Sequence, residues 1–310
     1  MPPILLLALL AAPAVYDLAG QLRPPAPASV SIFRVSSPFS ASTLADGSGR
    51  FNFKKLEPGD YTIAVFVPAR GEVRQTVEIG PASADARGRV VLAIALKDSD
   101  FQFAPVMQSH AVSARQLSIS AKAIHEYDDA QKDLARRDPD SAVRHLQRAV
   151  ELAPQFSVAW NNLGTIAYQT QNYARAEQCF REALRLDPTS YEPLVNLGGV
   201  LVTLHKLDEA WDYNLHAVLT RPNDALANSQ LGMTYFETGS MDLAEKYFRR
   251  ACELDPAHFS HPQLFLAEIH LRRGDTLAAA ADLEQFLRYH PDWPQAAKMR
   301  EQIAEWKAQR

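Results

Sequence analysis

The sequence contains few cysteines and no excess of basic residues, and both shortages exclude classes of protein. Its two cysteines, Cys179 and Cys252, are too few and too far apart for a disulfide framework or a cysteine metal motif. The formal net charge is −4. Nucleic-acid binding needs a dominant basic face, and a polybasic membrane anchor needs clustered Lys and Arg. We therefore expect neither a nucleic acid nor a charged membrane surface as a partner.

Long hydrophobic runs are also missing. The apolar run Met1–Leu10 is far shorter than the roughly 20 residues that span a bilayer. Followed by Ala12-Pro13-Ala14, it resembles the apolar segment and cleavage site of a secretory signal peptide, although no Lys or Arg precedes it. A buried first strand is the alternative. We expect residues 1–14 to be a signal peptide, and the mature protein to be secreted or periplasmic and not membrane-spanning.

Common catalytic motifs are absent. The sequence has no G-x-S-x-G, H-E-x-x-H, Walker loop or G-x-G-x-x-G. His258 and His261 lie three residues apart near Asp255, a spacing that serves a metal only if a further ligand is close. Because they flank a turn between repeats, we interpret them as solvated turn residues. We expect no catalytic residue, no metal site, no cofactor and no enzyme activity.

Residues 15–98 show the two-residue hydrophobic period of β-strands. Five runs alternate in this way: 30–35, 50–55, 61–67, 72–79 and 89–96. Gly, Pro and Asp separate them, and Asp46-Gly47-Ser48-Gly49 is a hairpin turn signal because glycine accepts positive φ. Short strands at this spacing without a helical pattern predict a small antiparallel β-sandwich.

One run within this region is more specific. Its spacing is D-x-x-G-x-F-x-F-x-x-L-x-P-G-x-Y, from Asp46 to Tyr61. The region resembles a carboxypeptidase regulatory-like domain, which has a prealbumin-like sandwich. The resemblance implies a non-catalytic spacer, a stabilising partner or a module that contacts carbohydrate or protein. Phe33, Phe39 and Phe66 could stack on a sugar, but we favour core packing because apolar aromatic residues are mostly buried.

Helical periodicity replaces the strand pattern near Ser113, after a segment without a clear period that we interpret as a linker, residues 99–112. From there the same residue types recur every 34 residues. The recurring positions are Ala142, Ala176, Ala210 and Ala244; Gly164, Gly198 and Gly232; and Pro154, Pro188, Pro222 and Pro256. A unit that repeats at this period must stack on copies of itself to bury its apolar face.

The period and the pattern W-x-x-L-G, A-x-x-x-F and a late Pro resemble the tetratricopeptide repeat. The resemblance implies an all-α superhelix at residues 113–310, with five helix pairs and a capping helix. The repeats are 123–156, 157–190, 191–224, 225–258 and 260–293, and the capping helix is 294–310. The fold expected for the whole chain is thus multidomain, an all-β sandwich followed by this helical array.

In such superhelices the first helix of each repeat lines a concave groove, which here predicts a peptide-binding groove. The expected groove residues are Tyr127, Gln131, Asn161, Asn162, Thr165, Tyr168, Val195, Asn196, Ser229, Met233, Phe236, Glu268 and Arg272. Lys is absent from these positions, which disfavours a clamp for a terminal carboxylate. Asn162 and Asn196 occupy matching places, where amides either bond a peptide backbone or satisfy nearby helix termini.

Two functions remain open at this point. The leading hypothesis is an exported, non-catalytic scaffold that binds a protein or peptide in the concave groove. The alternative is a cell-surface carbohydrate-binding protein in which the sandwich holds a glycan and the repeats mediate assembly. The sequence identifies neither the partner nor the oligomeric state.

Overall fold

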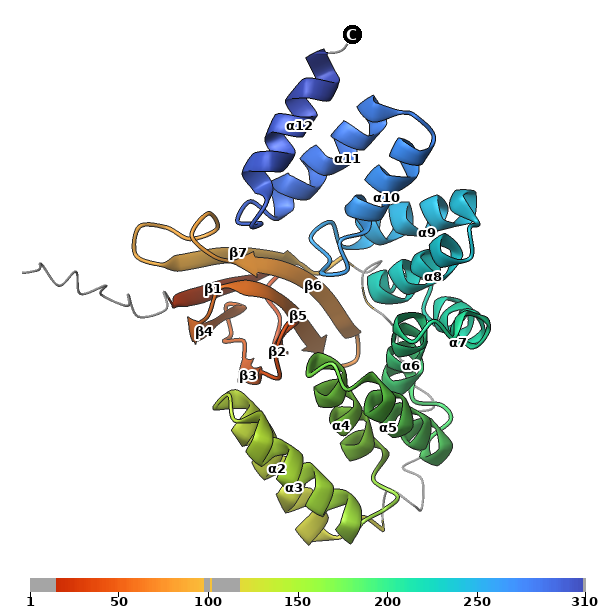
Figure 1. The fold of residues 1–310 in the computed structure, drawn as a ribbon. Helices are drawn as coiled ribbons and strands as arrows, with labels where there is room; N and C mark the ends of the chain where they lie inside the picture. The colour runs from red at the N-terminus through yellow and green to blue at the C-terminus, as the bar shows by residue number, and fades with distance from the viewer. Residues whose placement is uncertain (1–14, 98–100, 102–117, 309–310) are drawn as a thin grey trace, which may run out of the picture.

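The computed structural model describes residues 15–97, 101 and 118–308 (Figure 1). The expected signal peptide and nearly all of the expected linker lie outside the described residues. Phe101 is the exception within the linker. Its side chain is buried in the β core, and the Arg70 guanidinium lies 4.0 Å from the centre of its ring. The chain therefore still contributes to the β core at this position.

The N-terminal part of the described chain consists of two β-sheets. The strands are β1 (Tyr16–Arg23), β2 (Ser29–Arg34), β3 (Ser40–Leu44), β4 (Arg50–Leu56), β5 (Gly59–Val67), β6 (Gly71–Ile79) and β7 (Arg89–Ala95). One sheet has the order β4-β1-β7 and the other β3-β2-β5-β6. Apolar side chains from both sheets form one core. We call this part the β region.

The sequence motif of the β region occupies β4 and the turns on either side of it. Phe51, Phe53 and Leu56 are buried while the residues between them are exposed, as the alternation predicts. Asp46 accepts two backbone N–H donors across the preceding turn, and Gly49 adopts a φ of 77°. The run therefore combines three core anchors with a turn that needs glycine.

Two features of the β region differ from the expected antiparallel sandwich. The strand β3 was not predicted, because its sequence SASTL lacks hydrophobic alternation and all of its residues are at least partly exposed. The strands β1 and β7 pair in parallel, with Leu18 opposite Val90. A parallel pair needs a long connection, and here the chain passes through the whole second sheet between these two strands.

The rest of the described chain is an array of helices. They are α2 (Ala121–Ala135), α3 (Pro139–Leu152), α4 (Ser157–Gln169), α5 (Tyr173–Leu186), α6 (Tyr191–Thr203), α7 (Leu207–Thr220), α8 (Ala225–Glu237), α9 (Met241–Leu254), α10 (Pro262–Arg272), α11 (Thr276–Tyr289) and α12 (Ala296–Ala308). Among the described residues, no helix is both long and apolar enough to cross a membrane. The array curves around the β region, from α2 and α3 at one end to α12 at the other (Figure 1).

The recurring glycines lie where two helices approach closely. A Cβ atom on Gly164 would lie 2.5 Å from the Phe180 ring, and one on Gly232 would lie 2.9 Å from the Phe248 ring. At the matching place, Gly198 faces the side chain of Asn214. The period thus marks the contact between the first and second helices of each pair, as the sequence predicts.

The ends of the array show one correction and one agreement. The start near Ser113 that the helical pattern predicts lies outside the described residues, but the helix does not run on from there without a break, because residues 118–120 are not helical and α2 begins at Ala121. The Ser120 hydroxyl accepts a hydrogen bond from the Ala123 N–H and caps this helix. At the other end, Ile303 of α12 is buried against α11, so this helix covers the last repeat as its amphipathic pattern predicts.

Candidate binding site between the β region and the helical array

The β region lies inside the curve of the array (Figure 1), and its contacts with the array include the sheet edge formed by β6. The strand β6 is an edge strand, which leaves backbone groups available for pairing. The backbone N–H of Thr76 donates to the Asp255 carboxylate at 2.9 Å, and both residues are buried. Burial raises the pKa of Asp255 to about 6. The array therefore covers part of an edge that would otherwise face solvent.

Further contacts join the two parts at both ends of the curve. The side chain of Gln169 on α4 donates to the backbone carbonyl of Arg34 at 3.1 Å. Near the far end, the backbone N–H of Ala82 donates to the Asp292 carboxylate at 2.9 Å. Because these contacts lie near opposite ends of the array, the β region occupies much of the concave side that we expected to be an open groove.

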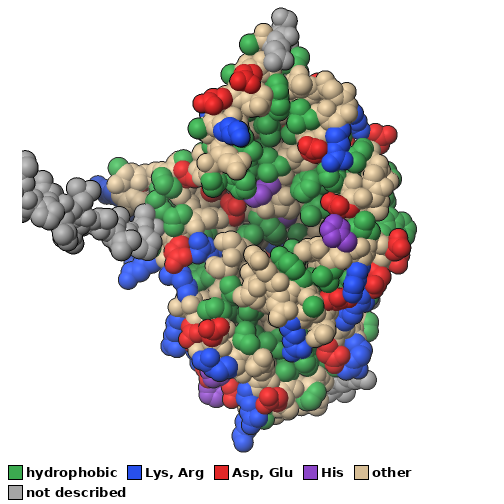
Figure 2. All heavy atoms as spheres, in the orientation of Figure 1, with side chains coloured by type: hydrophobic (Ala, Val, Ile, Leu, Met, Phe, Trp, Pro, Cys, Tyr) green, Lys and Arg blue, Asp and Glu red, His purple; other side chains and the backbone are tan. Residues whose placement is uncertain are grey.

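A cavity of about 410 Å³ remains between the two parts. In Figure 2 this face of the molecule is hollowed where the β region meets the array. The walls come from β2, β5, α4, α5, α6, α8 and α10 and from the segment that follows α9. The lining residues are Phe33, Arg34, Val35, Thr62, Thr165, Tyr168, Gln169, Phe180, Asn196, Gly199, Val202, Leu226, Gln230, Met233, Phe259, Ser260 and Phe265. Such a volume falls within the range of small-ligand pockets.

Four of the expected groove residues line this cavity: Thr165, Tyr168, Asn196 and Met233. They lie on α4, α6 and α8, the first helices of three successive pairs. The structure thus brings part of the predicted groove together around one partly open cavity. The remaining expected residues lie elsewhere.

The paired asparagines connect neighbouring repeats. The Asn162 amide donates to the Tyr127 hydroxyl at 3.2 Å, and the Asn196 amide donates to the Asn161 side-chain oxygen at 3.1 Å. Each bond joins residues that are 35 apart in the sequence, so it links the first helices of successive pairs. Burial raises the pKa of Tyr127. The amide of Gln131 has a buried nitrogen without a hydrogen-bond partner among the described residues.

The prediction that Val195 and Ser229 face an open groove is wrong, because both are buried. Val195 is only 2% exposed and packs against Leu194 and Leu231, and Ser229 is fully buried with its hydroxyl 2.6 Å from that of Ser260. The sequence period places them at the same repeat position as Asn161. In the middle of the array, however, the helix α6 is buried on nearly every side, so an equivalent position does not have an equivalent environment.

The last three expected groove residues are Phe236, Glu268 and Arg272. They lie outside the lining of the cavity, and Arg272 contacts the other two. Arg272 forms an ion pair with Glu268 at 2.8 Å, and its guanidinium lies 4.6 Å from the centre of the Phe236 ring. Both charged side chains are exposed. An exposed pair one helical turn apart is typical of a solvated helix face.

Sequence reasoning missed the wall of the cavity that the β region contributes. Phe33 and Phe66 were expected in the core, but they are 44% and 49% exposed, whereas Phe39 is buried as expected. The strand alternation contained the signal, because Ile32 faces the core and its neighbour Phe33 must face outward. The sheet register places Phe33 four residue positions from Ser29, the partner of Phe66, which is roughly 13 Å along the strand. The two rings therefore do not form a stacking platform for a sugar.

The interpretation of His258 and His261 as solvated turn residues is also wrong. His258 is almost completely buried, and its Nδ1 lies 2.7 Å from the Ser260 hydroxyl. Burial lowers the pKa of His258 to about 3 and that of His261 to about 4. The turn is covered by the β region, a neighbour that the local sequence does not reveal.

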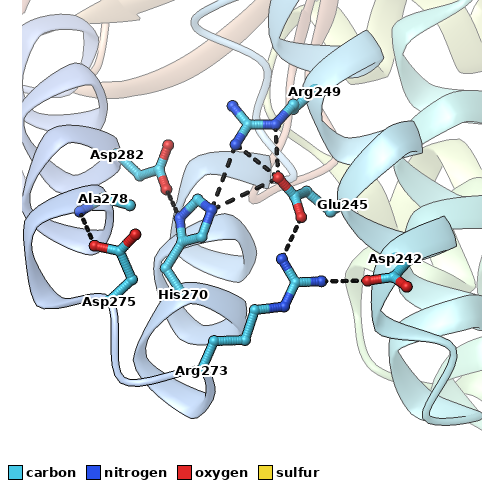
Figure 3. Close-up of polar contacts among 8 residues, drawn as sticks. All are labelled: Asp242, Glu245, Arg249, His270, Arg273, Asp275, Ala278 and Asp282. Atoms are coloured by element: carbon cyan, nitrogen blue, oxygen red, sulfur yellow. Dashed lines mark hydrogen bonds and ion pairs between the residues drawn. The ribbon is translucent and has the colours of Figure 1, made fainter.

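A second polar cluster lies within the array, where α9, α10 and α11 meet (Figure 3). The Nδ1 of His270 lies 2.7 Å from the Asp282 carboxylate, and its Nε2 lies 3.6 Å from Glu245. Glu245 also pairs with Arg249 and Arg273, which hold its pKa at about 2. Both nitrogens of this histidine have partners, so we interpret the cluster as a structural link between repeats.

Family models of the tetratricopeptide repeat match residues 127–191 and 225–258. These two segments of the helical array match tetratricopeptide repeats. Anaphase-promoting complex subunit 3 of Schizosaccharomyces pombe is 26% identical over 157 residues, which cover 51% of this chain and 24% of that protein. Tetratricopeptide repeat protein 5 of Mus musculus is 26% identical over 228 residues, covering 66% and 49%. The chain thus spans about a quarter of the first relative and about half of the second.

Solved structures support the same fold for the repeat array. A MamA fragment from Desulfovibrio magneticus RS-1 has a TM-score of 0.51 at 21% identity, covering 57% of this chain and 99% of that chain. The type IV pilus biogenesis factor PilW has a TM-score of 0.51 at 21% identity, covering 61% and 92%. At this identity the likeness shows the fold alone, and that fold is consistent with a protein-interaction scaffold.

Proposed function

We propose that the chain is an exported, non-catalytic scaffold that holds a short extended segment of a partner protein between its β region and its repeat array. The observation that carries this proposal is the cavity itself. It combines four residues of the predicted groove with a wall from the β region. The array of five helix pairs and a capping helix would give the site its concave wall.

The size of the cavity favours an extended segment over a helix. A long helix would need the concave side that the β region occupies, and a cavity of about 410 Å³ leaves room for only a short segment beside it. An extended segment places successive side chains on opposite sides. One row can then contact Phe33 and Tyr168, while the backbone faces the amides of Asn196 and Gln230.

The β region gives the proposal its second wall. We infer that it is a carboxypeptidase regulatory-like domain, because Phe51, Phe53 and Leu56 of the motif anchor its core. In this arrangement it shapes the binding site and is more than a spacer. Export rests on the signal-like run at residues 1–14, and tracing a tagged full-length chain to the extracytoplasmic fraction tests it.

The binding proposal is tested with the full chain and a displayed peptide library. Peptides selected on the wild-type protein are measured by fluorescence anisotropy against Thr165→Trp, which fills the cavity, and Asn196→Ala, which removes an amide. Leu219→Ala is the control, because this leucine is 71% exposed on α7 and lies outside the lining. We expect Thr165→Trp to weaken binding at least tenfold and the control to leave it unchanged. Equal binding by all three variants, or no selected peptide, contradicts the proposal.

A further inference from the structure

Three potential metal ligands meet at the boundary between the β region and the array. Asp60 comes from β5, His261 directly precedes α10, and His290 directly follows α11. The His261 Nε2 lies 3.9 Å from one oxygen of Asp60, and the His290 Nδ1 lies 3.6 Å from the other. One ligand atom from each of the three residues lies within 4.8 Å of the other two. Segments that are about 200 residues apart in the sequence thus converge on one point.

Several buried polar atoms of this cluster lack a hydrogen-bond partner in the part of the chain that the structure describes. His290 is 1% exposed at its side chain, and neither of its ring nitrogens has a hydrogen-bond partner among the described residues. The same is true of the Asp60 Oδ1, which faces the His290 Nδ1. The Nδ1 of His261 also has no partner there, but it is the Nε2 of this ring that faces Asp60. Buried polar groups in folded proteins are nearly always satisfied, so several orphaned atoms in one place call for an explanation. His270, whose nitrogens both have partners, shows how this chain satisfies a buried histidine without a further ligand.

A second carboxylate strengthens the case for a cation. Glu78 lies directly opposite Asp60 in the pairing of β5 with β6, and like charges in that position destabilise a sheet. One oxygen of Glu78 is buried without a hydrogen-bond partner in the described part of the chain. A bound cation would neutralise this pair of neighbouring acidic groups.

We propose that Asp60, His261 and His290 bind one zinc ion that joins the β region to the repeat array. Zinc bonds to imidazole nitrogen at about 2.0–2.1 Å and to carboxylate oxygen at about 2.0–2.2 Å, which puts neighbouring ligands of a tetrahedron roughly 3.4 Å apart. The observed 3.6 and 3.9 Å, each to a different oxygen of Asp60, exceed this by a few tenths of an ångström, and one ligand atom from each residue lies within 4.8 Å of the other two. Imidazole ligands favour zinc over calcium or magnesium, which prefer oxygen.

The surroundings of His261 fit this assignment. Its backbone is in the left-handed region, with φ 52° and ψ 53°, a strained conformation for a residue other than glycine, and such strain is common at functional sites. The rings of Phe286 and Trp293 lie 5.3 and 5.1 Å from its own ring and cover the cluster on the side of the array. An apolar shell of this kind restricts the access of solvent to a bound metal.

The test uses the full chain after treatment with a chelator. Zinc binding is measured by isothermal titration calorimetry, and the site geometry is measured by the visible spectrum of the cobalt(II) form. We expect one zinc ion per chain, a rise in Tm on zinc addition and a tetrahedral cobalt spectrum. Folded wild-type protein that binds no zinc at one-to-one stoichiometry overturns the proposal, whatever the variants do.

The variants assign the ligands. We expect Asp60→Asn and His261→Gln to weaken binding at least tenfold, and His261→Cys to retain it with a sulfur-to-cobalt charge-transfer band. His216→Gln, at an exposed histidine on α7, is the matched control and should bind zinc as the wild type does. Circular dichroism checks that each variant is folded. Unchanged affinity in folded Asp60→Asn and His261→Gln would assign the zinc to other residues and overturn the site.

Discussion

The close approach of Gly164 to Phe180 makes a prediction that can be worked out from the structure. A Cβ atom at Gly164 would lie 2.5, 2.7 and 3.0 Å from three atoms of the Phe180 ring, and this ring is only 2% exposed. Forcing a methyl group into a packed core costs about 1–3 kcal/mol. Replacing glycine by alanine within a helix returns about 1 kcal/mol. The net cost is then about 0–2 kcal/mol, and we expect Gly164→Ala to lower the free energy of unfolding by about 1 kcal/mol, the middle of this net range.

Shortening the ring should reverse the sign of this effect. In a Phe180→Leu background the methyl group no longer meets the ring, and Gly164→Ala should then raise the free energy of unfolding by about 0.5–1 kcal/mol through helix propensity alone. The effects of Gly164→Ala in the two backgrounds then differ by about 1.5–2 kcal/mol. This difference is the coupling energy between the two positions, and it is within the range measured for residues in contact. Urea unfolding followed by far-ultraviolet circular dichroism measures all four members of the cycle.

A remote cycle provides the control. Combining Gly164→Ala with Phe248→Leu should give additive effects within about 0.5 kcal/mol, because the two sites share no contact. The reasoning is refuted if Gly164→Ala stabilises the wild type, or if its cost is the same in the Phe180→Leu background as in the wild type. Either result would mean that the recurring glycine does not serve the approach of the ring.

Three further predictions concern other parts of the array. Gly239 has φ 81°, and a Cβ atom added to it would have no neighbouring atom within 4 Å, so Gly239→Ala should lower the free energy of unfolding by about 1–2 kcal/mol from backbone strain alone. Conversely, His205 has φ 54°, and His205→Gly should raise the free energy of unfolding by about 0.5 kcal/mol. Urea unfolding measures both changes. Burial raises the pKa of Cys252 to about 12 and also raises that of Cys179; both thiols should resist alkylation at pH 8 until the chain unfolds, and rapid labelling of the native chain contradicts this. Burial raises the pKa of Asp255 from 3.8 to about 6, so wild-type stability relative to Asp255→Asn should fall by about 2 kcal/mol as the pH rises from 4 to 7. A flat difference between the two unfolding free energies contradicts this.

The repeat architecture could be predicted because its signals are local and recur. Alanine and glycine return at the same places in successive copies, and Gly164 and Gly232 face phenylalanine rings in the same way. The alternation in β4 was similarly informative, because one buried face is enough to orient Phe51 and Phe53. In each case the residues that determine the outcome lie close together in the sequence.

The packing of the β region against the array could not be predicted for the opposite reason. The bond from Thr76 to Asp255 joins residues that are 179 apart, and the bond from Gln169 to Arg34 joins residues that are 135 apart. Neither partner carries a local pattern that names the other. The same contact explains why His258 and His261 are buried although their sequence reads as a turn, and why His290 could not be grouped with His261 in advance.

This packing also separates two kinds of partner by their energetics. A short extended segment can enter the cavity while the β region stays in place. A long helix needs the concave side that the β region occupies, so it must first break contacts such as the one between Thr76 and Asp255. Its apparent affinity is then reduced by the fraction of molecules in which the two parts are separated. A change that loosens the packing should therefore strengthen the binding of a helical partner and weaken that of an extended one, because the extended segment loses the wall formed by Phe33.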